Sequence, residues 1–304
     1  MSTPMGPRKL LDALILEGCK VVELPGWKYR NRNHKGPWGP VHGVMIHHTV
    51  TKGTNKTVGI IRDGYSSLPG PLSHGMIAKD GTVYLVGLGR ANHAGLGDPD
   101  VLQAVISEKN PPRDNDATAD GNRYFYGFEC ENLGDGKDPW PQAQIDAIEK
   151  ASAAICRVHG WGAKSVIRHL DWQPGKIDPY GPGMDWPSLQ GDIAKRLGQG
   201  RPPALPSPQR PVVSLSKLIA AARRDPRKAG TPVTYSGVST VEAALVDEGL
   251  LSKKYDDGHY GYATIEAYAQ WQRMCGFKGS DADGIPGKES LAKLAKKHSF
   301  QVIV

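Results

Sequence analysis

The chain has 304 residues and a formal net charge of +7, and a length well above roughly 200 residues predicts two domains. Residues 201–304 carry 15 Lys and Arg against 10 Asp and Glu, so most of the positive charge lies in the tail. This charge suits a polyanionic partner, but the sequence has no run of about five like charges, which argues against nucleic-acid binding. No apolar stretch approaches about 18 residues, so we expect no insertion into a membrane.

The first segments along the chain indicate one amphipathic helix followed by strands. Residues 10–16 are apolar apart from Asp12, and no small-residue cleavage site follows them. We therefore expect a helix there, and synthesis without a signal peptide. Short apolar runs predict strands at residues 20–24, 43–48, 81–86 and 127–131, with a turn opening the third.

Two longer segments follow, one irregular and one helical. Residues 108–123 are polar and contain prolines, so we expect a long surface loop that borders a substrate groove. Residues 141–159 place Ile145, Ile148 and Ile155 near a spacing of 3.6 residues, which predicts a helix. Strands that alternate with helices indicate an α/β fold.

A proline-rich segment marks the clearest domain boundary. Residues 199–211 contain five prolines, a composition typical of an extended spacer that packs into neither neighbouring core. The sequence therefore predicts a catalytic domain at residues 1–198, a linker at 199–211 and a smaller, mainly helical domain at 212–304.

Residues far apart in the sequence offer ligands to one divalent metal. The strand 43–48 ends in His47 and His48, and neighbouring side chains of a strand point to opposite faces, so we favour His47 alone as a ligand. Asp178 lies nine residues after His169 across a Pro-Gly turn that can fold the carboxylate back beside the imidazole. Two imidazoles, a carboxylate and an open fourth position are typical of catalytic zinc. The pattern predicts a metallohydrolase with zinc at the strand ends of a mixed central sheet flanked by helices.

The same residues resemble the zinc-dependent N-acetylmuramoyl-L-alanine amidases of phage endolysins and bacterial wall-recycling enzymes, whose fold the peptidoglycan recognition proteins share. The similarity covers about residues 43–186, where a hydrophobic strand ends in His47, His169 opens a Pro-Gly loop, and Asp178 follows Lys176 by two residues. The resemblance implies that His47, His169 and Asp178 bind Zn2+. It also implies that Lys176 lies near the oxyanion that develops during amide hydrolysis.

Further segments resemble the substrate side and the acid/base strand of this family. Asn92 and His93 lie in a segment similar to the His-Ala-Gly element, which implies that both bind substrate, although His93 could instead hydrogen-bond its own loop. Glu129 lies in a segment similar to the strand that carries a catalytic glutamate, and Glu131 is an alternative on the same face of that strand. Some relatives have a tyrosine where this chain has Ser73, which leaves the acid/base role to Glu129.

The resemblance implies that the substrate is peptidoglycan and that the broken bond joins N-acetylmuramic acid to L-alanine of the stem peptide. Three tryptophans near the motifs, Trp140, Trp172 and Trp186, could form the rim of a groove or belong to the core.

The tail resembles a helical peptidoglycan-binding module in which Asp-Gly loops each precede a helix. Candidate copies of the loop lie at residues 257–258 and 283–284. Such a module would tether the catalytic domain to the cell wall and raise its local concentration there. Tyr260, Tyr262 and Trp271 could offer stacking surfaces, although Trp271 is also a candidate for the core.

These features predict a monomeric, endolysin-type peptidoglycan hydrolase that is made in the cytoplasm of a phage host and acts at the cell wall after release. Two alternatives stay open: a metallo-endopeptidase that cuts within the stem peptide, and a non-catalytic peptidoglycan recognition protein. The complete set of ligands and Glu129 argues against the second alternative.

Overall fold

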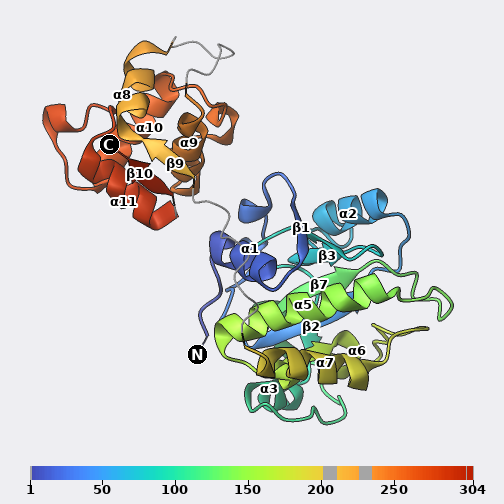
Figure 1. The fold of residues 1–304 in the computed structure, drawn as a ribbon. Helices are drawn as coiled ribbons and strands as arrows, with labels where there is room; N and C mark the ends of the chain where they lie inside the picture. Colours follow the sequence, from blue (N-terminus) through green and yellow to red (C-terminus); the bar gives the residue numbers. More distant parts are fainter. Residues whose placement is uncertain (1, 201–210, 226–234, 299, 304) are drawn as a thin grey trace. The chain divides into compact units, whose positions relative to one another are not determined.

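The computed structural model describes residues 2–200, 211–225, 235–298 and 300–303. The chain divides into two compact units, residues 1–205 and residues 206–304, each with its own hydrophobic core (Figure 1). Most of the proline-rich segment 199–211 lies outside the described residues. None of the helices in the described ranges is both long and apolar enough to cross a membrane.

A six-stranded mixed sheet forms the centre of the first unit, as the sequence predicts. In spatial order its strands are β1 (Lys20–Glu23), β4 (Thr82–Leu85), β3 (Gly75–Ile77), β7 (Phe125–Cys130), β2 (Gly43–His48) and β8 (Val166–Arg168). Neighbouring strands are parallel except for β3 and β4, which are antiparallel. The register of the β2–β7 pair sets His47 opposite Glu129.

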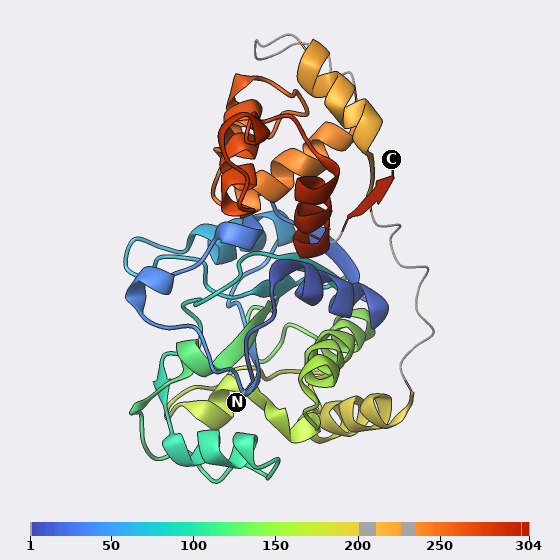
Figure 2. The ribbon, with the colours of Figure 1, turned by 90° about the vertical axis from the view of Figure 1, so that its left-hand side faces the viewer.

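Helices cover both faces of this sheet, and alternation along β2 assigns its residues to the two sides. Val44 and Ile46 pack into the main core, to which helices α1 (Pro7–Leu16), α5 (Gln142–His159) and α7 (Trp186–Gly198) contribute. The helices α5 and α7 lie side by side in both views (Figures 1 and 2). Met45 belongs to a second cluster on the opposite side, together with α3 (Pro99–Ile106) and α6 (His169–Trp172). Each fully buried side chain of this size stabilises the fold by about 1.5–3 kcal/mol.

The first unit contains further elements. They are α2 (Thr54–Asp63), α4 (Gly121–Tyr124), the paired strands β5 (Leu96–Gly97) and β6 (Ala119–Asp120), and 3-10 turns at Trp27–Tyr29, Asn33–Lys35 and Ala163–Ser165.

The expected surface loop at residues 108–123 is shorter than predicted, because its last residues form β6 and α4. The pairing of β6 with β5 returns the chain to the segment that follows His93. Asp98 organises the remaining loop, since its carboxylate accepts hydrogen bonds from the backbone N–H groups of Asp100, Asn115 and Asp116. Polar composition alone did not reveal this pairing, because a two-residue strand is too short to produce a periodic pattern.

The second unit is mainly helical, as predicted. It contains α8 (Leu215–Arg224), α9 (Gly237–Asp247), α10 (Tyr262–Met274) and α11 (Lys288–His298), 3-10 turns at Lys253–Tyr255 and Gly279–Asp281, and the parallel strands β9 (Val212–Ser214) and β10 (Gln301–Ile303).

The aromatic residues of this unit lie in different environments. Trp271 is buried in the core and donates its Nε1–H to the carbonyl of Ser290. Tyr260 is also fully buried, with its hydroxyl donated to the carbonyl of Gly284, so the prediction that it offers a stacking surface is wrong. Tyr262 is 66% exposed.

Several histidines of the first unit couple its stability to pH. Burial lowers the pKa values of His47, His74 and His159 to about 4. In the unfolded chain these side chains have pKa values of about 6.5. Between about pH 6.5 and 4 the unfolded state therefore binds more protons than the folded state. The contribution of these neutral histidines to the free energy of unfolding is therefore complete above about pH 6.5 and is lost progressively as the pH falls. The loss is on the order of 1–3 kcal/mol for a fully buried histidine.

We expect the unfolding temperature of the metal-free first unit to fall as the pH is lowered from 7.5 to 5, as measured by calorimetry. The variant His159→Gln should show a shallower fall, because it removes one of these titrating groups. An unfolding temperature that stays constant or rises over this range would contradict the assignment of neutral buried histidines.

Candidate metal centre

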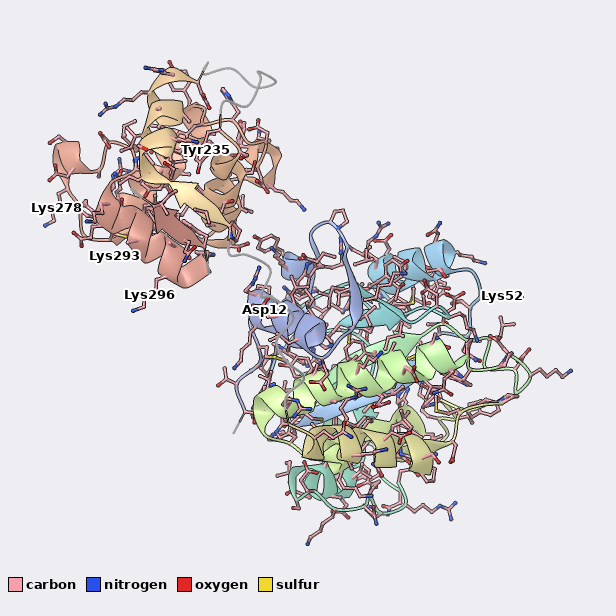
Figure 3. All side chains as sticks on the ribbon, in the orientation of Figure 1. Asp12, Lys52, Tyr235, Lys278, Lys293 and Lys296 are labelled. Atoms are coloured by element: carbon pink, nitrogen blue, oxygen red, sulfur yellow. The ribbon has the colours of Figure 1, made fainter. Side chains whose placement is uncertain are left out.

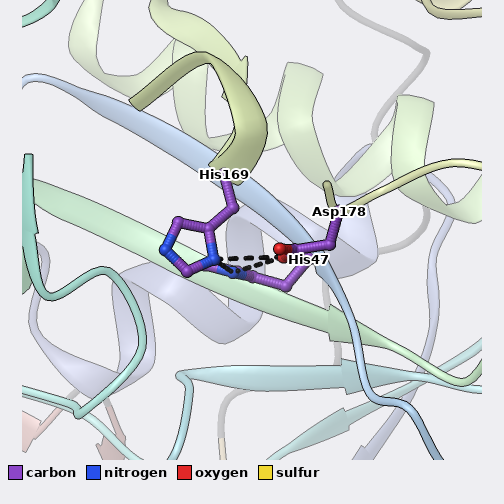
Figure 4. A group of neighbouring side chains, drawn as sticks. All are labelled: His47, His169 and Asp178. Atoms are coloured by element: carbon purple, nitrogen blue, oxygen red, sulfur yellow. Dashed lines mark hydrogen bonds and ion pairs between the residues drawn. The ribbon is translucent and has the colours of Figure 1, made fainter. Parts of the chain in front are cut away.

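Three side chains from different elements converge at the carboxyl ends of the central strands (Figure 4). His47 lies at the end of β2, and His169 opens α6 directly after β8. Asp178 lies nine residues later, where its carbonyl accepts a hydrogen bond of 2.8 Å from the backbone N–H of Leu170. This backbone contact folds the Pro-Gly loop back, so that the carboxylate reaches His169.

The three ligand atoms form a nearly regular triangle. The Nδ1 atoms of His47 and His169 are 3.0 Å apart. The Oδ2 atom of Asp178 lies 3.2 Å from Nδ1 of His47 and 3.1 Å from Nδ1 of His169. All three residues are buried, and among the described residues they form the group of His, Cys, Asp and Glu side chains suited to a metal ion.

Hydrogen bonds alone cannot satisfy this triangle. Each Nδ1 can donate one proton or accept one, so if both imidazoles donate to Asp178, their N–H groups face each other. A cation can accept lone pairs from all three atoms at once. Tetrahedral zinc with bonds of about 2.0–2.1 Å would hold its ligand atoms about 3.3 Å apart, close to the observed separations. The donor set and its spacing therefore fit zinc.

The protonation of the ligands also suits a cation. Burial, followed by the nearby charge of His169, lowers the pKa of His47 to about 4, so its imidazole is neutral at physiological pH. Burial disfavours the charged form of Asp178, but its close contacts with the imidazoles of His169 and His47 outweigh this effect and hold its pKa well below the usual range. The site thus presents a neutral imidazole beside an ionised carboxylate.

Both histidines make a further contact through Nε2. The Nε2 atom of His47 lies 3.0 Å from Nδ1 of His93, and Nε2 of His169 lies 3.3 Å from Oε1 of Gln173. The sequence analysis missed Gln173, although its place four residues after His169 is a signal for a neighbour on the same helical turn.

The predicted substrate-binding residues lie in the segment before β5. His93 is 8% exposed and packs edge-on against the ring of His47, with 5.1 Å between ring centroids. Asn92 is partly buried, and its side chain donates to the carbonyl of Pro69 while its backbone N–H donates to that of Pro71.

Glu129 lies beside the candidate metal centre on β7, opposite His47 in the strand register. Its Oε2 atom is buried and has no hydrogen-bond partner. Burial raises the pKa of Glu129 well above its ordinary value, the negative charge of Asp178 raises it further, and the charge of Lys176 opposes this rise. A carboxyl in this state can exchange a proton near neutral pH.

Glu131, the alternative acid/base residue, has a different environment. Its carboxylate accepts hydrogen bonds of 2.7 Å from the backbone N–H of Gly53 and 2.8 Å from the hydroxyl of Thr54. These contacts hold the start of α2, where unpaired backbone N–H groups favour a negative charge. The carboxylate of Glu131 is therefore already used by the fold, whereas that of Glu129 is not.

Lys176 lies exposed in the loop between His169 and Asp178. Its positive charge acts on the pKa values of both His47 and Glu129, which places its field at the site. The tryptophans considered for the groove rim, Trp140, Trp172 and Trp186, are buried and belong to the hydrophobic cores.

Residues 37–181 match the sequence profile of the N-acetylmuramoyl-L-alanine amidase family. The match covers less than half of the chain, and we call these residues the amidase-family segment. The amidase-family segment contains every predicted site residue and all strands of the central sheet except β1. No curated protein matches the chain in sequence.

Several solved structures are also similar to the chain. An endolysin N-acetylmuramoyl-L-alanine amidase from Clostridium intestinale is 18% identical, covers 57% of this chain and 95% of its own, and gives a TM-score of 0.39. The amidase AmiD from E. coli, solved in complex with an anhydro-N-acetylmuramic acid peptide as substrate, is 19% identical, covers 86% of this chain and 91% of its own, and gives a TM-score of 0.39. Drosophila PGRP-LB is 15% identical, covers 60% of this chain and 94% of its own, and gives a TM-score of 0.35.

Proposed function

We propose that this protein hydrolyses the amide bond between N-acetylmuramic acid and L-alanine in peptidoglycan, with zinc bound by His47, His169 and Asp178. The observation that carries the proposal is the buried triangle of ligand atoms within the amidase-family segment. The unpartnered carboxylate oxygen of Glu129 beside that triangle supports a hydrolytic role over binding alone.

The residues around the triangle can divide the work of hydrolysis. A zinc ion bound there would polarise the amide carbonyl and lower the pKa of a water molecule. Glu129 accepts a proton from the attacking water as the oxygen–carbon bond forms. It then donates that proton to the nitrogen of L-alanine as the carbon–nitrogen bond breaks, which leaves a carboxylic acid and a free amine. Its raised pKa suits both transfers.

Lys176 contributes a positive charge on the solvent side of the site. Because the carbonyl oxygen gains negative charge in the transition state, a fixed cation nearby stabilises that state more than the ground state. The exposed position of Lys176 lets its ammonium group reach a substrate that enters from solvent.

A soluble N-acetylmuramoyl peptide provides the direct test. We expect the product to carry a new free amine on L-alanine, as identified by chromatography and mass spectrometry. A zinc chelator should stop the reaction, and added zinc should restore it. Cleavage between two amino acids of the stem peptide would instead establish an endopeptidase.

We further propose that the second unit binds the cell wall, as part of an endolysin that is made in a host cell and attacks the wall after release. The candidate Asp-Gly loops precede α10 and α11, which supports the resemblance to a peptidoglycan-binding module. Lys278 and Lys296 project from this unit (Figure 3). Such basic side chains suit an anionic wall polymer.

Removing the second unit, by ending the chain at residue 205, should lower the affinity for purified cell walls, measured by co-sedimentation, by at least about tenfold. The reason is that one of two binding sites is lost. Hydrolysis of the soluble muropeptide should change less than about threefold, since the candidate metal centre lies wholly in the first unit. Equal losses in both assays would show that the second unit belongs to the catalytic fold.

A further inference from the structure

We propose that His93 is a positioning residue for the metal centre: it fixes the tautomer of His47 that directs an unprotonated Nδ1 toward His169 and Asp178. This inference rests on the proposed metal site and assigns His93 a role different from substrate binding.

The hydrogen-bond pattern around His93 determines which nitrogen carries each proton. Its Nε2 atom lies 3.1 Å from the carbonyl oxygen of Phe125, and a carbonyl only accepts, so this nitrogen carries the proton. In a neutral imidazole the other nitrogen, Nδ1, is then an acceptor. It lies 3.0 Å from Nε2 of His47, which must therefore donate. The neutral ring of His47 is left with a lone pair on Nδ1, the atom that faces the other two ligands.

The backbone around His93 holds its ring in this position. The side-chain oxygen of Asn122 accepts hydrogen bonds from the backbone N–H groups of both His93 and Ala94, at 2.8 Å and 2.9 Å. Gly127 provides space for the ring, because a Cβ atom at that position would lie 2.5 Å from Nδ1 of His93. Since Gly127 has no backbone angle that demands glycine, close approach of the imidazole is the reason for glycine there.

These contacts leave little for a substrate to bind. Both ring nitrogens of His93 are engaged inside the protein, and the residue is 8% exposed. A partner that orients a metal-binding histidine typically affects metal affinity by about 10–100-fold. If His93 positions His47, replacing it should change the zinc dissociation constant. If His93 bound substrate, replacing it would instead change KM.

Two substitutions of similar shape separate the effect of the hydrogen-bond acceptor of His93 from the effect of its packing. His93→Asn can place its Oδ1 where Nδ1 lies, whereas His93→Leu has no acceptor, and both lose the hydrogen bond to Phe125. We expect the zinc dissociation constant of His93→Leu, measured by competition with a chromophoric chelator, to rise about 10–100-fold. His93→Asn should stay within about threefold of the parent. Gly127→Ala, which displaces the ring, should resemble His93→Leu.

The outcomes distinguish this inference from the proposed function. A parent protein that binds no zinc would refute the metal site itself. A folded His93→Leu variant with parental zinc affinity would refute the role of His93, and a raised KM in that variant would return His93 to the substrate side.

A second measurement needs no substitution. Long-range 1H–15N spectra of the zinc-free parent, labelled at histidine, should show His93 and His47 both protonated at Nε2. A proton on Nδ1 of His93 would overturn the inference even if the variants failed to fold.

Discussion

Replacing Glu129 by glutamine should lower kcat by about 10²–10⁴-fold while the protein stays folded and binds zinc as the parent does. Glutamine has the same shape as glutamate but cannot take a proton from water or return it to the leaving amine. The substitution costs little stability, because Oε2 of Glu129 has no hydrogen-bond partner to lose. Turnover of a soluble muropeptide, zinc content and unfolding temperature, measured on the same preparation, check all three expectations.

Glu131→Gln is the matched control, since it makes the same chemical change two residues further along. Its carboxylate accepts from Gly53 and Thr54, so the loss should reduce stability by about 1–2 kcal/mol while kcat changes only severalfold. If Glu131→Gln lost activity and Glu129→Gln kept near-normal turnover, the acid/base role would belong to Glu131.

His169→Ala should abolish both zinc retention and hydrolysis, because two remaining ligands hold the metal far more weakly than three. The effect is also visible without substrate. Zinc at about 100 times its dissociation constant should stabilise the parent by about 2.7 kcal/mol, whereas the variant should show no zinc-dependent rise in unfolding temperature. Metal content by mass spectrometry and calorimetry with and without zinc provide the readouts.

His34→Ala serves as the control for that experiment, because His34 is exposed and lies outside the triangle of ligand atoms. It should bind zinc and hydrolyse substrate as the parent does. A His169→Ala protein that still bound one equivalent of zinc with unchanged affinity would contradict the ligand set.

Two parts of the predicted ligand set follow from local features of the sequence: the choice of His47 over His48, and the return of Asp178 to His169. Alternation along β2 places His47 and His48 on opposite faces of the sheet. His47 lies on the face that carries the second hydrophobic cluster, whereas His48 packs near Tyr180 on the opposite face. The Pro-Gly turn predicts that Asp178 returns to His169, and the hydrogen bond from Leu170 to Asp178 completes that return.

Other features depend on contacts between distant segments and could not be read locally. Period-2 alternation puts Glu129 and Glu131 on the same face of a strand, but β7 ends at Cys130, and Glu131 turns to the start of α2. His93 lies 46 residues from His47 in sequence, so only the folded chain shows that their rings touch. The motif drew attention to His93, and its position in the fold suggests its role.

The most direct test of the account is mass spectrometry of purified peptidoglycan digested by the protein, with and without a zinc chelator. The account predicts chelator-sensitive release of intact stem peptides that begin with L-alanine, from glycan strands that stay uncut. Stem peptides cut internally, or no products from walls to which the protein is bound, would contradict it.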